Sequence, residues 1–199
     1  ALTINEKKQC RYNSEGNMTE FIVYKSDGSI LYKNTYKYDD RNNEIERDYY
    51  CCGISTPSIT KHEYIYNEKN QEVEHVEYSV NTEPKDYTKH KFTYDNVGNV
   101  IEEKEYSYDG SISRKIKYKY NDNRKIIEET FLDDKDIFMD KRTYDYDAKG
   151  NLINEKWINK IGEVYVNMSR KYDLKGNLSE VVYYDEINEP TSKNVFEYN

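Results

Sequence analysis

One short pattern recurs along this chain at nearly constant spacing, and it limits the fold to a tandem array. A tyrosine is followed at once by Asp or Asn and then by a turn, as in Y-D-N-V-G-N, Y-D-A-K-G-N and Y-D-L-K-G-N. We call these tyrosines the anchor tyrosines. They are spaced by 26 or 28 residues and stand at Tyr12, Tyr38, Tyr66, Tyr94, Tyr120, Tyr146, Tyr172 and Tyr198. Repeats of this length are typical of supersecondary units that pack against their neighbours.

The residues after each anchor tyrosine predict a tight turn. The Asp or Asn can accept hydrogen bonds from backbone N–H groups two or more residues later. The fourth residue after the anchor is Gly or Asn in six of seven units, and these residues best tolerate a positive φ. These fourth residues are Gly16, Asn42, Asn70, Gly98, Arg124, Gly150 and Gly176. Because Arg124 departs from this pattern, we expect a distorted or shifted turn in its unit.

On both sides of each turn the sequence alternates with period two, which indicates β-strands. Ile116, Tyr118 and Tyr120 alternate with lysines, for example, and a second strand leaves the turn and ends at a second, looser turn such as S-D-G-S. We therefore predict an all-β fold, an antiparallel meander of about seven tandem hairpin repeats in a twisted or coiled single sheet. Residues 1–199 form a single repeat domain, with a partial unit at Tyr198.

Two charged positions also recur in the units, and we expect them to form rows across the sheet. The residue five before the anchor is nearly always Lys, and the residue eight after it is nearly always Glu. The set comprises Lys7, Lys33, Lys61, Lys89, Lys115, Lys141 and Lys193, with Glu20, Glu46, Glu74, Glu102, Glu128 and Glu180. Cross-strand pairing and solubility explain such rows, and a ligand-binding row is the alternative.

Composition narrows the functional classes. Charged residues make up 34% and hydrophobic residues 36% of the 199 residues, so the 23 tyrosines must supply much of any core. The net charge of -8 argues against nucleic-acid binding, which depends on neutralising phosphates. No apolar run approaches the roughly 20 residues of a membrane-spanning helix. The N-terminal residues lack the apolar segment of a signal peptide, although a leader could have been removed.

Known catalytic, metal and cofactor motifs are not found. The cysteines Cys10, Cys51 and Cys52 lack metal-site spacing, and the adjacent pair leaves open either unpaired thiols or a vicinal disulfide. His62 and His90 occupy equivalent positions two strand spacings apart, and His75 is expected on the opposite side of the sheet, so we predict no metal site. Neighbouring carboxylates should face opposite ways. We therefore expect no enzyme activity and no cofactor.

Two units are longer by two residues each, in the loops Cys51 to Ser58 and Val80 to Asp86. Insertions on one edge of a repeat array often contact a partner. Ordinary variation in loop length is the alternative.

The motif Y-D-x-x-G-N, followed by an aliphatic residue, a strand and a D-G turn, resembles the YD repeats, also called RHS repeats. The resemblance is clearest at Tyr94 to Asn99 with Asp109-Gly110, at Tyr146 to Asn151 and at Tyr172 to Asn177. These units are longer than typical YD repeats, and Asn follows the turn glycine where the family often has Arg. The resemblance implies β-hairpin units of bacterial surface or secreted proteins, some linked to carbohydrate binding.

An aromatic row is the candidate binding surface. The anchor tyrosines and the residues two before them share one side of the strands. The candidate binding residues are Tyr36, Tyr38, Tyr64, Tyr66, Phe92, Tyr94, Tyr118 and Tyr120, with Tyr144 and Tyr146 continuing the row. If the sheet curls, the row becomes a core; if the sheet stays open, it is an exposed platform for sugars or an extended partner.

The predicted function is a non-catalytic repeat scaffold, secreted or at a bacterial cell surface, that binds a carbohydrate or a protein. Self-association through sheet edges is a further candidate interaction. The alternatives are a structural spacer, or a fragment of a longer YD-repeat array. A glycan-active enzyme is the alternative from another class.

Overall fold

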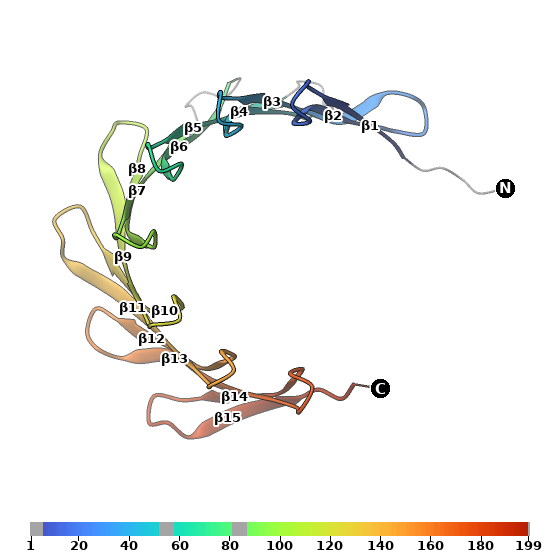
Figure 1. The fold of residues 1–199 in the computed structure, drawn as a ribbon. Helices are drawn as coiled ribbons and strands as arrows, with labels where there is room; N and C mark the ends of the chain where they lie inside the picture. The colour runs from blue at the N-terminus through green and yellow to red at the C-terminus, as the bar shows by residue number, and fades with distance from the viewer. Residues whose placement is uncertain (1–5, 52–57, 81–86, 199) are drawn as a thin grey trace. The chain divides into compact units, whose positions relative to one another are not determined.

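The computed structural model describes residues 6–51, 58–80 and 87–198, and within these ranges it contains strands and turns but no helix (Figure 1). The strands form one sheet in chain order, and neighbouring strands pair antiparallel wherever their register is defined. The predicted all-β meander is therefore confirmed. No described segment is a helix long and apolar enough to span a membrane.

The strands are short and similar in length. They are β1 (Lys7–Tyr12), β2 (Met18–Tyr24), β3 (Ile30–Tyr38), β4 (Glu44–Cys51), β5 (Ser58–Tyr66), β6 (Glu72–Ser79), β7 (Tyr87–Tyr94), β8 (Val100–Tyr106), β9 (Ile112–Tyr120), β10 (Ile126–Leu132), β11 (Phe138–Tyr146), β12 (Leu152–Asn159), β13 (Val164–Tyr172), β14 (Leu178–Tyr184) and β15 (Pro190–Val195). Seven of the odd-numbered strands, β1 to β13, end at an anchor tyrosine.

The chain divides into two compact units. Unit 1 comprises Ala1–Phe92 with Glu105–Ser111, and unit 2 comprises Thr93–Lys104 with Ile112–Asn199. The contacts below lie within one unit or the other. The prediction of a single repeat domain over 1–199 stays a prediction.

The turn after each anchor tyrosine is a five-residue loop with two backbone hydrogen bonds. In the turn from Asp147 to Asn151, the Asp147 N–H donates to the Asn151 carbonyl and the Gly150 N–H donates to the Asp147 carbonyl, both at 2.9 Å. The Asp147 carboxylate also accepts hydrogen bonds from the backbone N–H groups of Lys149 and Asn151, at 2.9 and 2.8 Å. Gly150 has a φ of 83°. This geometry confirms the predicted roles of the Asp and the Gly.

Two predictions about turns were wrong. The Arg124 turn is not distorted, because Arg124 adopts a φ of 58° and its N–H donates to the Asn121 carbonyl at 2.9 Å, as Gly150 does in its own turn. The second turn of the unit is not looser either. In the turn from Ser107 to Ser111, the same two backbone bonds measure 2.9 Å. The two hydrogen bonds therefore hold the left-handed position even where the residue is not Gly or Asn.

The two strands that flank most anchor turns change their pairing register by one residue, just after the pair that contains the anchor tyrosine. Tyr66 pairs with Glu72, but Ile65 pairs with Glu74, so that Val73 is an extra residue on β6. The same shift occurs between Lys37 and Tyr38 of β3. A bulge of this kind changes which side of the sheet the rest of the strand presents.

The hydroxyl of the anchor tyrosine donates to a backbone carbonyl in the preceding repeat. Each acceptor carbonyl belongs to the first residue of the strand that leaves the preceding anchor turn. The observed pairs are Tyr38 with Met18 (2.7 Å), Tyr66 with Glu44 (2.9 Å), Tyr120 with Val100 (2.7 Å), Tyr146 with Ile126 (2.9 Å) and Tyr172 with Leu152 (3.0 Å). This bond fixes each anchor tyrosine to its neighbouring repeat.

The charged rows are present as alternating ion pairs on the opposite side of the sheet. Glu128 lies between Lys119 and Lys141, at 2.8 and 2.9 Å. Burial tends to raise the pKa of Glu128, but the hydrogen bonds from these two lysines outweigh it and the pKa is lowered. Glu180 pairs in the same way with Lys171 and Lys193. Cross-strand ion pairing therefore accounts for the recurring Lys and Glu positions.

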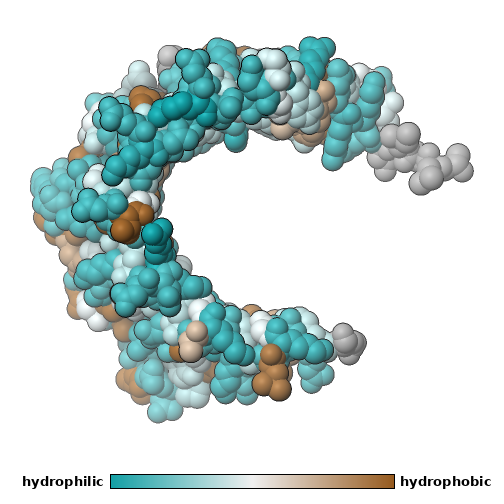
Figure 2. Space-filling view, viewed as in Figure 1, coloured by the Kyte–Doolittle hydropathy of each residue, from teal (hydrophilic) through white to brown (hydrophobic). Residues whose placement is uncertain are grey.

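Few side chains are fully buried. Among the described residues, the buried hydrophobic side chains are Ile22, Val23, Ile116, Leu132 and Val181. The view in Figure 2 is mostly hydrophilic, with scattered hydrophobic patches. The aromatic row is half-buried throughout, so it is neither a closed core nor a fully exposed platform. Packing within one layer therefore leaves most apolar side chains partly exposed.

We predict that Tyr146→Phe destabilises the protein, because it leaves the Ile126 carbonyl without its donor while retaining the ring. A lost hydrogen bond of this kind costs about 0.5–1.5 kcal/mol, which corresponds to a fall in melting temperature of roughly 1–6 °C for a chain of this size. Circular dichroism melting measures the change. Tyr183→Phe is the control, since this ring is 37% exposed. Equal melting temperatures for both variants would contradict the role of the anchor hydroxyl.

Candidate functional site

The structure places all eight candidate binding residues on one side of the strands, which we call the tyrosine face. In unit 1 they are Tyr36 and Tyr38 on β3, Tyr64 and Tyr66 on β5, and Phe92 on β7; in unit 2 they are Tyr94 on β7 and Tyr118 and Tyr120 on β9. Every one of them is half-buried. Each unit thus holds its own part of the row.

Carboxylates hold several of the rings that stand two residues before an anchor. The hydroxyl of Tyr118 donates to Glu103 Oε2 at 2.8 Å, and that of Tyr144 donates to Glu129 Oε2 at 3.0 Å. Burial, together with Glu129, raises the pKa of Tyr144 to about 12. These phenols therefore stay protonated and act as hydrogen-bond donors at neutral pH.

A cationic group is packed between rings on the same face of unit 2. The guanidinium carbon of Arg142 lies 4.7 Å from the ring centre of Phe131 and 4.2 Å from that of Trp157. Arg142 also pairs with Glu129 at 3.6 Å. Arg142 carries no signal in the sequence, because its role depends on cross-strand register rather than on the repeat.

The tyrosine face of unit 1 carries a cluster of histidines. His62 on β5 and His75 on β6 meet with His62 Nδ1 and His75 Nε2 3.2 Å apart. Glu77 Oε2 lies 3.7 Å from His62 Nδ1. The ring of Tyr64 stacks on that of His75 with centroids 4.5 Å apart, and the His90 ring lies 6.1 Å from His75 on the other side.

The prediction that His75 faces the opposite side of the sheet was wrong. Without a bulge, Tyr64 would pair with Glu74, and His75 would lie on the side of the charged rows. The extra residue Val73 shifts the register, so Tyr64 pairs with His75 instead. The recurring Lys and Glu positions were the available signal, because they share a face only if this bulge exists.

The cluster has a mixed charge environment. Arg47 on β4 stands opposite His62 in the strand register. Its guanidinium forms an ion pair with Glu44, in which Arg47 Nε lies 2.8 Å from Glu44 Oε1. Burial raises the pKa of the nearby Glu72 carboxyl. His62 and His75 are half-buried, whereas Glu77 is exposed. The ligand-type atoms of these last three residues all lie within 4.8 Å of one another.

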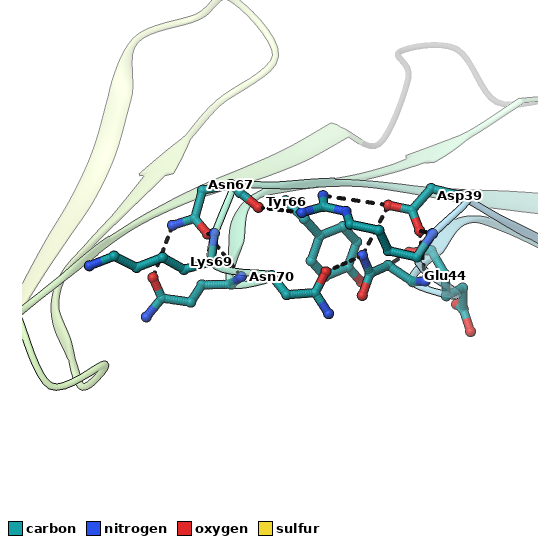
Figure 3. Close-up of polar contacts among 9 residues, drawn as sticks. Asp39, Glu44, Tyr66, Asn67, Lys69 and Asn70 are labelled. Carbon is teal, nitrogen blue, oxygen red and sulfur yellow. Dashed lines mark hydrogen bonds and ion pairs between the residues drawn. The ribbon is translucent and has the colours of Figure 1, made fainter.

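Neighbouring anchor turns also contact one another in unit 1, as Figure 3 shows around Asp39, Asn67 and Asn70. The Asn43 side-chain amide donates to Asn70 Oδ1 at 2.5 Å, and the Arg41 guanidinium donates to the Asn67 carbonyl at 3.0 Å. These bonds account for the polar side chains of the turns, so the turns have a structural role.

The remaining candidates fall in two groups. As expected, the adjacent carboxylates Glu128 and Glu129 face opposite ways, one toward the lysines and one toward Tyr144. Cys51 ends β4 and is half-buried. Cys52 lies outside the described residues, so the choice between unpaired thiols and a vicinal disulfide stays open. Most of the two longer loops, at 52–57 and 81–86, lies outside them too.

No protein-family model matches the sequence, and no curated protein matches it. Among solved structures, TcdB2-TccC3-TEV is 12% identical with a TM-score of 0.36, and the match covers 98% of this chain and 12% of that one. TcdB2-TccC3 without its hypervariable C-terminal region is 9% identical with a TM-score of 0.37, over 96% of this chain and 12% of that one.

A porin-like protein from Bacteroides uniformis is 11% identical with a TM-score of 0.47, over 95% of this chain and 90% of that one. This chain therefore spans about an eighth of the TcdB2-TccC3 chains and most of the porin-like chain.

We predict that acidification destabilises the protein through His75. Burial lowers the pKa of His75, and the neighbouring His62, His90 and Arg47 lower it further, against a smaller opposing effect of Glu77. Because the folded pKa lies below the ordinary histidine value of 6.5, stability is fully present above that pH and is lost as the pH falls through the folded pKa. The measurement is melting temperature from pH 8 to 5 in the presence of EDTA, and His75→Gln should flatten the profile. The same acid-dependent fall in wild type and variant would contradict this assignment.

Proposed function

We propose that this protein is a non-catalytic repeat scaffold that binds a carbohydrate through the tyrosine face. The observation that carries the proposal is a row of half-buried aromatic rings, a pair in each of five successive repeats, and the protein itself holds several of their hydroxyls. In unit 2 the row includes Tyr118, Tyr120, Tyr144 and Tyr146. Rings fixed in this way lose little conformational freedom when a ligand binds.

The chemistry of the face suits a sugar chain. A pyranose ring has an apolar C–H surface that stacks on an aromatic ring, and its rim of hydroxyls both donates and accepts hydrogen bonds. The tyrosine face supplies ring surfaces next to charged groups, such as Glu129 and Arg142 beside Tyr144. An extended glycan can contact equivalent rings in successive repeats, so that several weak contacts add within one chain.

The resemblance to YD repeats supports the same class of function. The motif residues at Tyr146 to Asn151 and Tyr172 to Asn177 are the basis of that resemblance. We accordingly propose that the protein acts outside the bacterial cytoplasm, secreted or at the cell surface. An antibody against the protein should label intact cells or appear in the culture medium, and labelling that requires permeabilised cells would contradict this placement.

We predict that replacing either of two neighbouring rings of the tyrosine face weakens glycan binding. A glycan array identifies the polysaccharide that binds the wild type, and calorimetry then measures its affinity for Tyr118→Ala and Tyr144→Ala. Each variant should lose at least about tenfold, equivalent to about 1.4 kcal/mol. Tyr118→Phe should retain most of the affinity if ring stacking dominates.

Tyr184→Ala is the matched control, because the Tyr184 hydroxyl bonds with Ser169 on the opposite side of the sheet. Circular dichroism of each variant establishes that the sheet is intact. If no glycan binds the wild type, or if Tyr184→Ala weakens binding as much as Tyr118→Ala, the proposal fails. The protein would then fit the alternative of a structural spacer or a protein-binding array.

A further inference from the structure

The histidine cluster of unit 1 has the donor set and the spacing of a transition-metal site. His62 and His75 offer imidazole nitrogens, and Glu77 offers a carboxylate oxygen. Two histidines with one glutamate are an established zinc donor set, in which the fourth position is left open. The repeat pattern does not require this set, since His62 recurs as His90 and Glu77 as Glu105, but no other unit has a histidine at the position of His75.

The distances between the donor atoms fit one ion. Zn²⁺ binds nitrogen and oxygen ligands at about 2.0–2.2 Å, so the ligands of a tetrahedral site lie about 3.3–3.6 Å apart. The His62 Nδ1 to His75 Nε2 distance is 3.2 Å, and the His62 Nδ1 to Glu77 Oε2 distance is 3.7 Å. The remaining pair is within 4.8 Å, and rotation of the exposed Glu77 side chain can shorten it.

The elements of the sheet hold two of the ligands in place. β5 and β6 are paired, with His62 opposite Glu77 and Tyr64 opposite His75. The Tyr64 ring stacks on His75 at 4.5 Å and limits its rotation. Arg47 places a positive charge beside the cluster and opposes a cation, but its ion pair with Glu44 at 2.8 Å offsets that charge.

We propose that His62, His75 and Glu77 bind a divalent transition metal of the Zn²⁺ class on the tyrosine face of unit 1. Imidazole nitrogens favour Zn²⁺, Cu²⁺ or Ni²⁺ over Ca²⁺ and Mg²⁺, which prefer oxygen ligands. The exposed position of Glu77 leaves the fourth coordination position open to water or to a hydroxyl of a bound molecule. This site is independent of glycan binding and does not rest on it.

The test is a titration of the EDTA-treated, dialysed protein with ZnCl₂, followed by calorimetry and thermal melting. We expect one Zn²⁺ per chain and a melting temperature that rises with Zn²⁺, because the ion binds only the folded sheet. MgCl₂ and CaCl₂ should leave the melting temperature unchanged. Loss of a direct ligand should weaken Zn²⁺ binding by at least about tenfold in His75→Gln and in Glu77→Gln.

Glu63→Gln is the matched control for Glu77→Gln. Glu63 lies next to His62 on β5, but its carboxylate accepts a hydrogen bond from Tyr78 on the opposite side of the sheet. The Glu63→Gln variant should bind Zn²⁺ as the wild type does. If His75→Gln fails to fold, the exposed Glu77→Gln still provides the comparison.

Co²⁺ in place of Zn²⁺ distinguishes this site from the cysteines. A nitrogen and oxygen site gives visible d–d bands without the near-ultraviolet charge-transfer band of a thiolate ligand. No Zn²⁺ binding, a thiolate band, or equal affinity in Glu77→Gln and Glu63→Gln would each overturn the proposal.

Discussion

A single-layer sheet must cover both of its faces with its own side chains, and this constraint shapes the whole chain. Only a few hydrophobic side chains, such as Val23 and Leu132, are buried among the described residues. The remaining cover comes from side chains that are apolar in their bodies and polar at their ends. Tyrosine covers most of one face, and lysine and glutamate, together with tyrosines such as Tyr78 and Tyr184, cover the other. The low hydrophobic content is therefore compatible with a folded array.

Much of the architecture could be predicted from the sequence because its signals are local. The turn depends on residues within five positions, so Asp147 and Gly150 were assigned correctly from their chemistry. The predictions that failed concern the conformation of Arg124 and the face of His75, which the residues of a single turn do not determine. Arg124 adopts the left-handed conformation because the paired strands impose it, and the bulge at Val73 changes the face of every later residue on β6.

The candidate site was predicted in part for the same reason. The tyrosine row follows from alternation within single strands, and all eight residues share a face. The histidine cluster instead depends on which residues of two strands stand opposite, and a shift of one residue decides this. Contacts such as Arg142 between Phe131 and Trp157 depend on three strands at once. A single sequence carries little information about such registers.

The anchor hydroxyl bonds to a backbone carbonyl, and the residue that supplies the carbonyl differs in each case: Met18, Glu44, Val100, Ile126 or Leu152. Since the acceptor is present in every amino acid, the side chain at that position is free to vary without loss of the bond. Duplicated repeats can thus diverge in sequence and still join to one another in any order. An array built this way can gain, lose or exchange repeats by recombination while each junction stays intact.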